Sequence, residues 1–300
     1  MDYDQLFERN LGIYQRKEQE RIRKARFVII GCGGIGGTIA IALARSGVEH
    51  FFLMEHDVYK PSNLNRQIAC FQDTLGRNKA TCIREKILRI NPEADVEVHE
   101  RALTGEDIPK VAEWGDVIAP VMDEWPLSLT VLEVVRKSKP AVMAYPVGAL
   151  ARVCTFTAES PTVAECLAMP YGYGYEELSE YTVRPEARKL LQYYVTEGEW
   201  REAWFDRWVE GKLPHSQLCT TVWITACLAA QEMLNAVSGK WPLVIAPRYW
   251  HITPASAQIK RFAFGRRIIS RLSRRRRLQR LFPRLTHSKR LLRLFTRLLG

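Results

Sequence analysis

The chain has 300 residues, of which 47% are hydrophobic, and this is enough for one large domain, or two small ones, with a buried core. No apolar run reaches the roughly 20 residues of a transmembrane helix, which argues against a membrane-spanning protein. Seven cysteines without evident pairing, and no amino-terminal signal sequence, predict a reducing, cytoplasmic location.

The formal net charge of +11 is concentrated at one end of the chain. Residues 260–300 contain fifteen Lys and Arg and no Asp or Glu. The other 29 basic and 33 acidic residues leave residues 1–259 with a charge of −4. The basic character therefore belongs to the tail alone.

The first strand predicted to lie in the core is Arg26–Ile30, followed by a glycine-rich turn and a helix over Ile35–Arg45. The glycines of the turn are Gly31, Gly33, Gly34 and Gly36. Such a turn lets the backbone approach a ligand closely and points amide N–H groups and the helix amino terminus toward an anion. The pattern predicts a phosphate-binding loop.

A second hydrophobic run, His50–Met54, predicts the next strand, and Glu55 follows it directly, 19 residues after Gly36. An acidic side chain at this position can accept hydrogen bonds from ribose hydroxyls, and Asp57 lies close by. To this point the sequence fits a nicotinamide dehydrogenase as well as an ATP-binding protein.

Arg66 and Lys79 favour ATP, because both supply cationic donors suited to clustered phosphate charge, and hydride transfer has no general need for them. Lys79 begins a predicted helix, Lys79–Arg89. A fourth apolar run, Val117–Met122, predicts a strand with Asp123 at its carboxyl end, where a carboxylate could hold Mg²⁺ together with phosphate oxygens. Pro120 interrupts this run and predicts a strand that begins later or bulges there.

Strand and helix patterns alternate up to about Tyr145, which predicts an α/β fold with a doubly wound, mostly parallel sheet. Residues 158–211 differ, with a Tyr-Gly segment and an acid- and tryptophan-rich helical stretch, Glu186–Glu210, and predict a lid, a recognition insert or a helical cover for apolar surface. A long helix, Gln217–Val237, and two closing strands, Tyr249–Thr253 and Ile259–Phe264, are predicted to follow.

In this order and spacing, the motifs resemble the ubiquitin-activating-enzyme-like adenylyltransferases of the ThiF, MoeB and HesA type over roughly residues 1–260. The resemblance implies a Rossmann-like fold, use of ATP and Mg²⁺, and a homodimer. It implies that the glycine loop, Glu55 and Asp57 hold the adenosine. It further assigns the following roles: a nucleotide contact to Asn63, phosphate contacts to Arg66 and Lys79, a metal contact to Asp123, and a contact with the phosphates of the partner subunit's nucleotide to Arg9. The family usually has Asp where this chain has Glu55.

The cysteines set this chain apart from many members, which carry two Cys-x-x-Cys pairs. The cysteines are Cys32, Cys70, Cys82, Cys154, Cys166, Cys219 and Cys227. No two of them have that spacing, so we expect no structural zinc. Cys166, and Cys219 near a helix start, remain alternatives for a nucleophilic thiol, whereas Cys154 is expected in the core.

Residues 266–300 predict a basic amphipathic helical tail. Leu291, Leu292, Phe295, Leu298 and Leu299 share one helical stripe, with arginines on the other face. This profile predicts attachment to an anionic membrane surface, peripherally on the cytoplasmic face. Nucleic acid such as RNA, another protein and disorder are the alternatives.

We therefore expect residues 1–265 to form an ATP-binding adenylyltransferase domain. It would activate a carboxylate as an acyl-adenylate with release of pyrophosphate, the carboxylate being the carboxyl terminus of a small ubiquitin-like or sulfur-carrier protein, or of a peptide. Asp123→Ala and Lys79→Ala are each expected to abolish this activity with the fold intact. The alternatives are a Rossmann-type NAD-dependent oxidoreductase, a tRNA-modifying ATP-dependent dehydratase and a non-catalytic ATP-dependent scaffold.

Overall fold

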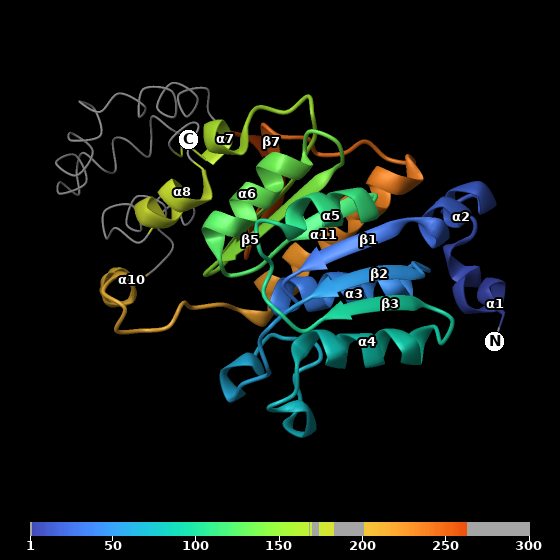
Figure 1. The fold of residues 1–300 in the computed structure, drawn as a ribbon, viewed down its shortest axis with the longest axis horizontal. Helices are drawn as coiled ribbons and strands as arrows, with labels where there is room; N and C mark the ends of the chain where they lie inside the picture. Colours follow the sequence, from blue (N-terminus) through green and yellow to red (C-terminus); the bar gives the residue numbers. More distant parts are fainter. Residues whose placement is uncertain (1, 168, 170–173, 183–200, 263–300) are drawn as a thin grey trace.

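The structure, a computed structural model, describes residues 2–167, 169, 174–182 and 201–262 (Figure 1). The α-helices are α1 (Tyr3–Phe7), α2 (Arg16–Lys24), α3 (Gly34–Arg45), α4 (Lys79–Ile90), α5 (Asp107–Trp114), α6 (Trp125–Val135), α7 (Val163–Leu167), α8 (Tyr175–Thr182), α10 (Glu202–Val209) and α11 (Cys219–Ser238). The strands are β1 (Arg26–Ile30), β2 (His50–Met54), β3 (Asp95–His99), β4 (Val117–Pro120), β5 (Ala141–Val147), β6 (Leu150–Phe156), β7 (Arg248–Thr253) and β8 (Ser256–Arg261).

These strands form one sheet in the order β3-β2-β1-β4-β5-β6-β7-β8. The strands from β3 to β5 run parallel, and β6, β7 and β8 join them by antiparallel pairing. The direction of winding reverses between β1 and β4, because the chain builds β1, β2 and β3 outward and then returns to place β4 on the other side of β1. Open α/β sheets bind ligands at the carboxyl ends of the strands at such a point.

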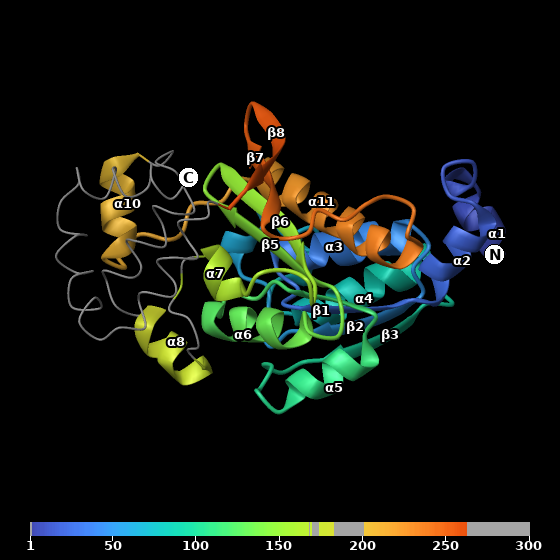
Figure 2. The same cartoon turned by 90° about the horizontal axis from the view of Figure 1, so that it is seen from above.

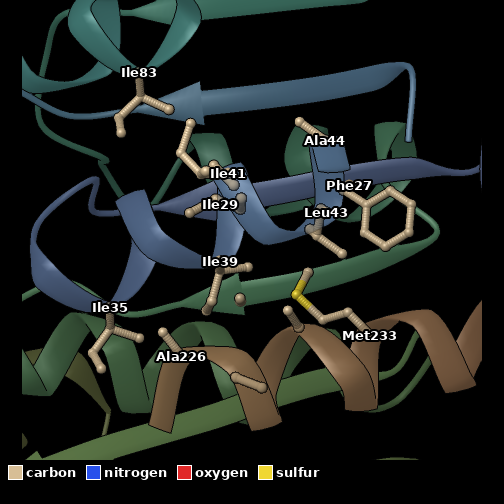
Figure 3. Close-up of a cluster of buried hydrophobic side chains, with 14 of the residues drawn as sticks. Phe27, Ile29, Ile35, Ile39, Ile41, Leu43, Ala44, Ile83, Ala226 and Met233 are labelled. Atoms are coloured by element: carbon tan, nitrogen blue, oxygen red, sulfur yellow. The ribbon is translucent and has the colours of Figure 1, made fainter. Parts of the chain in front are cut away.

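Helices cover both faces of the sheet, and each face has its own apolar core (Figure 2). On one face Phe27 and Ile29 of β1 pack with Ile39 of α3, and α4 and α11 complete the cluster (Figure 3). On the other face Val28 and Ile30 pack with residues of α5 and α6. Strand β1 is buried on both faces, as its unbroken apolar sequence predicts.

The predicted α/β class and mostly parallel sheet are confirmed, and the predicted helices agree with α3, α4 and α11 within two residues at either end. The last closing strand was misplaced by several residues, because β8 spans Ser256–Arg261.

The prediction for Pro120 was wrong, since β4 neither begins later nor bulges. Pro120 pairs with Ile30 in regular register as the last residue of β4. The amide of Val121 then donates to the Ile30 carbonyl at 2.8 Å, so the hydrogen bonding between β4 and β1 continues past the proline.

The insert predicted over residues 158–211 contributes α7, α8 and α10 to the described structure, and part of the helical stretch expected at its end is α10. In Figures 1 and 2, α8 and α10 lie toward the carboxyl ends of the parallel strands, and α1 and α2 lie toward the amino ends. Residues 183–200 and the tail predicted over residues 266–300 lie outside the described residues. None of the described helices is long and apolar enough to cross a membrane.

Candidate active site

A cavity of about 810 Å³ lies at the carboxyl ends of the parallel strands. Its lining includes these predicted site residues: Gly31, Gly33, Gly34, Glu55, Asp57, Arg66, Lys79 and Asp123. The cavity therefore collects residues from five separate stretches of the sequence at the point where the winding of the sheet reverses. We call the side with Glu55, Asp57 and Lys79 the β2 end, and the side with Arg66, Asp123 and His215 the β4 end.

The glycine loop has close neighbours that explain two of its glycines. Gly31 has a φ of +93°, and a Cβ there would come within 2.8 Å of the Met122 backbone. A Cβ on Gly36 would lie 1.8 Å from the Gly31 carbonyl oxygen. Gly36 is not part of the cavity lining, so its absent side chain serves the packing of α3 against the loop.

Glu55 is buried, and both of its carboxylate oxygens accept backbone hydrogen bonds. Oε2 accepts from the Cys32 amide and Oε1 from the Asp57 amide, each at 3.0 Å. Its carbonyl accepts a hydrogen bond of 3.0 Å from the side chain of Asn78, whose Oδ1 caps α4 by accepting from two of its amides. The carboxylate is thus fixed beside the glycine loop, where it can also accept from a ligand hydroxyl.

Lys79 and Asp57 form an ion pair across the β2 end, with 2.9 Å between Nζ and Oδ2. The side chain of Lys79 is only 7% exposed and that of Asp57 is 39% exposed. Partial burial acts to raise the pKa of the Asp57 carboxyl, but the hydrogen bond and charge of Lys79 outweigh it and hold that pKa below its usual value. The ammonium group is therefore oriented by a partner within the protein itself.

The β4 end is more open, since Asp123 is exposed just beyond β4. Arg66 donates to the Ser62 carbonyl at 3.0 Å and to Asn65 Oδ1 at 2.8 Å, while its buried Nε has no hydrogen-bond partner among the described residues. Burial lowers the pKa of the Arg66 guanidinium, and the Asp123 carboxylate opposes this effect. The Arg66 guanidinium and the exposed Asp123 carboxylate are therefore suited to bind a phosphate and its counterion.

Besides Gly36, two of the predicted residues lie away from the cavity lining, Asn63 and Arg9. Asn63 is buried, and its Oδ1 accepts a hydrogen bond of 2.9 Å from the Lys60 amide, so it shapes the turn that carries Arg66. Arg9 is exposed in a short 3₁₀ helix, Glu8–Asn10, next to α1 at the amino-terminal edge of the sheet. It does not line the cavity of its own chain.

Three residues at or next to the cavity were not predicted from the sequence. Asn78 does not line the cavity but supports Glu55, and Asn before a helix is a recognisable amino-terminal cap. Arg152 on β6 is buried over the ring of Tyr249, and no sequence signal distinguishes it from other strand residues. His215 lies between α10 and α11, where burial is the main cause that lowers its pKa to about 4.

The cysteines considered as nucleophiles do not line the cavity. Cys166 is 2% exposed in α7, and Cys219 is partly exposed as the first residue of α11. Cys154 lies in the core, as predicted, and burial raises its thiol pKa well above the usual value. Among the residues that the structure describes, no three Cys, His, Asp or Glu side chains are grouped so that they could hold a metal ion by themselves.

The fold and the cavity together define a nucleotide-binding α/β protein with a phosphate loop, an acidic residue after the second strand and cationic residues opposite. Residues 7–267 match the model of the ThiF family. The chain belongs to this family.

Among curated proteins, it is 32% identical over 106 residues to the tRNA threonylcarbamoyladenosine dehydratase of Haemophilus influenzae, which covers 35% of this chain and 41% of that protein. It is 34% identical over 107 residues to the probable adenylyltransferase/sulfurtransferase MoeZ of Mycobacterium tuberculosis, covering 36% of this chain and 27% of MoeZ. The matched regions thus span less than half of these relatives.

The fold is similar to that of Escherichia coli MccB, with a TM-score of 0.65 and 20% identity over 86% of this chain and 68% of MccB. A structure of MccB with ATP gives a TM-score of 0.60 at 19% identity, over 81% of this chain and 65% of MccB. At this level of identity the likeness shows a shared fold.

Proposed function

We propose that this chain is an ATP-dependent adenylyltransferase that activates a carboxylate as an acyl-adenylate and releases pyrophosphate. The observation that carries the proposal is the single cavity that unites the glycine loop and Glu55 with Arg66, Lys79 and Asp123. A dinucleotide site would account for the first two of these features. Lys79 beside Glu55, together with Arg66 and the exposed Asp123 carboxylate at the β4 end, supplies the charges suited to a triphosphate and Mg²⁺.

In this mechanism each residue has a role that follows from its surroundings. Glu55, fixed by two backbone amides, accepts hydrogen bonds from the ribose. Lys79 and Arg66 stabilise negative charge on the phosphates as the substrate carboxylate attacks the α-phosphorus. Asp123 would hold Mg²⁺, which in turn would neutralise the departing pyrophosphate. Such a transfer depends on positioning and charge stabilisation more than on a protein base.

The activated carboxylate is proposed to be the carboxyl terminus of a small ubiquitin-like or sulfur-carrier protein, or of a peptide. Relatives named adenylyltransferase/sulfurtransferase, and fold neighbours crystallised as MccB with MccA, support this class of substrate. ATP–pyrophosphate exchange, screened against candidate carrier proteins and peptides, tests it. Exchange that depends on one such carboxyl terminus is expected, and binding of NAD without binding of ATP would overturn the proposal.

A second candidate is a dehydratase that acts on a modified tRNA base, because the region matched to the Haemophilus influenzae dehydratase lies within the same family. The two candidates differ in what stimulates ATP turnover. Total tRNA would stimulate ATP cleavage by a dehydratase, whereas a carrier protein or peptide would stimulate pyrophosphate exchange by the adenylyltransferase proposed first.

A homodimer is also proposed, in which Arg9 of one protomer reaches the nucleotide of its partner. Two observations support it: Arg9 lies away from the cavity of its own chain, and α11 has an uncharged exposed face. On this face Trp223 is 40% and Ile224 48% exposed. Mixing Arg9→Ala with Asp123→Ala protein should restore activity through hybrid dimers, whereas strictly additive activities would contradict the shared site.

Residues 266–300 are proposed to attach the protein peripherally to the cytoplasmic face of an anionic membrane, on the strength of their charge and their apolar stripe. Co-sedimentation with vesicles of phosphatidylcholine, with and without phosphatidylserine, tests this for the full chain and for a chain that ends at residue 265. Binding that requires both the anionic lipid and the tail is expected. Equal binding of both chains would contradict it.

A further inference from the structure

The segment between α10 and α11 lines the cavity, and two contacts with other parts of the chain hold it in place. Gln217 forms a parallel β-bridge with Gly148, and its carbonyl accepts a hydrogen bond of 3.1 Å from the side chain of Asn65. Asn65 immediately precedes Arg66. The same contacts that hold this segment in place therefore join it to the loop that carries a proposed phosphate ligand.

His215 is partly buried and lines the cavity, as do its polar neighbours Ser216 and Gln217. The ring of Trp208 in α10 meets its imidazole edge-on, with 5.5 Å between the ring centroids. Asp123 and Arg66 line the same cavity as His215, and their charges act in opposite directions on the pKa of its imidazole. Trp208, Asp123 and Arg66 belong to three separate stretches of the chain and surround the β4 end of the cavity.

We propose that His215 is a further nucleotide-binding residue, whose imidazole N–H donates a hydrogen bond to a phosphate oxygen of ATP between Arg66 and Asp123. This inference rests on the proposed function. Glu55 is assigned to the ribose, so the phosphates would extend from it past Lys79 and toward Arg66 and Asp123 at the β4 end. An imidazole carries at least one N–H donor in either protonation state, and Trp208 limits the orientations of the ring.

Isothermal titration of the full-length protein separates a phosphate contact from a general structural role. The titrants are ATP with Mg²⁺, and adenosine, which has the ribose and base but no phosphate. His215→Ala is expected to weaken ATP binding by about tenfold to a hundredfold, the range of a charge-assisted hydrogen bond. Binding of adenosine should change less than about twofold, because the β2 end is untouched.

Two variants serve as controls. His215→Gln restores an N–H donor and is expected to recover part of the lost affinity for ATP. His50→Ala removes a partly exposed histidine at the amino end of β2, whereas the cavity lies at the carboxyl ends of the strands. This variant should leave both affinities unchanged.

The outcomes distinguish the inference from the function on which it rests. Wild-type affinity for ATP in His215→Ala, or an equal loss for ATP and adenosine, would overturn the role of His215. Failure of the wild-type protein to bind ATP would overturn the proposed function itself.

Discussion

At the β2 end of the cavity, hydrogen bonds and an ion pair with nearby residues hold each candidate side chain. The β4 end is assembled from residues that are far apart in the sequence. Glu55 accepts two amides, and Lys79 is paired with Asp57. At the β4 end, Asp123 is exposed, and His215 is carried in by a segment that follows the insert. The comparison suggests that the side chains of the β2 end are held rigidly by the protein, whereas the charged side chains of the β4 end gain further partners from the ligand. Four substitutions test this division.

The largest expected effect comes from Gly36→Ala, which breaks the support of the whole glycine loop. Its Cβ would lie 1.8 Å from the Gly31 carbonyl oxygen, a backbone atom that cannot yield without shifting α3. We expect a loss of about 3 kcal/mol or more in the free energy of unfolding, measured by urea denaturation. Gly105→Ala is the matched control, because no atom lies within 4 Å of the added Cβ. Equal midpoints for both variants would contradict the packing role.

Lys79→Ala and Asp123→Ala should separate the two ends. Lys79→Ala removes a side chain that is only 7% exposed together with its ion pair with Asp57, and we expect a loss of about 1–3 kcal/mol in the free energy of unfolding. Asp123→Ala removes an exposed carboxylate, and its stability should stay within about 0.5 kcal/mol of the wild type. Both variants should lose pyrophosphate exchange. The structure therefore revises the expectation from the sequence that both substitutions leave the fold equally intact.

A reversed order, with Asp123→Ala the less stable protein, would show that the β4 end is the rigid one. Lys110→Ala provides a control for the loss of an exposed lysine, and its stability should not change.

The smallest expected effect is on the pH dependence of stability. The pKa of the Asp57 carboxyl is lowered from its usual value of 3.8, so its ionised form stabilises the fold above that value. This contribution is lost as the pH falls below about 3.8 and approaches the pKa of the folded state. Because Asp57 is more than one-third exposed, the contribution is about 1 kcal/mol or less. The acid limb of a stability profile should be flatter in Asp57→Asn, and an unchanged limb would show that Lys79 does not depend on this partner.

The sequence predicted the β2 end better than the β4 end for a physical reason. Strand, turn and helix signals for Gly31, Glu55 and Lys79 are local, and parallel strands bring their carboxyl ends to one edge. Asn63 illustrates the limit, because its motif position does not reveal that its side chain bonds to the Lys60 amide within a turn.

His215 and Arg152 could not be placed from the sequence. His215 reaches the cavity through contacts of its segment with Gly148 and Asn65, and Arg152 through antiparallel pairing of β6 with β5. Neither contact produces a periodic pattern in the local sequence. Pro120 was misjudged because the position of a strand's end, and hence which amides its ladder requires, depends on the neighbouring strand.

The position of α11 has a consequence for synthesis on the ribosome. A Cβ on Gly34 would lie 2.9 Å from the Val222 side chain, and Trp223 donates a hydrogen bond to the Arg66 carbonyl across 157 residues of sequence. The glycine loop and Arg66 thus emerge early in translation, but the surface against which they settle emerges only with α11. A nascent chain that has not yet exposed α11 therefore has the glycine loop without the side chains that pack against it, so this part of the proposed nucleotide site can be completed only late in translation.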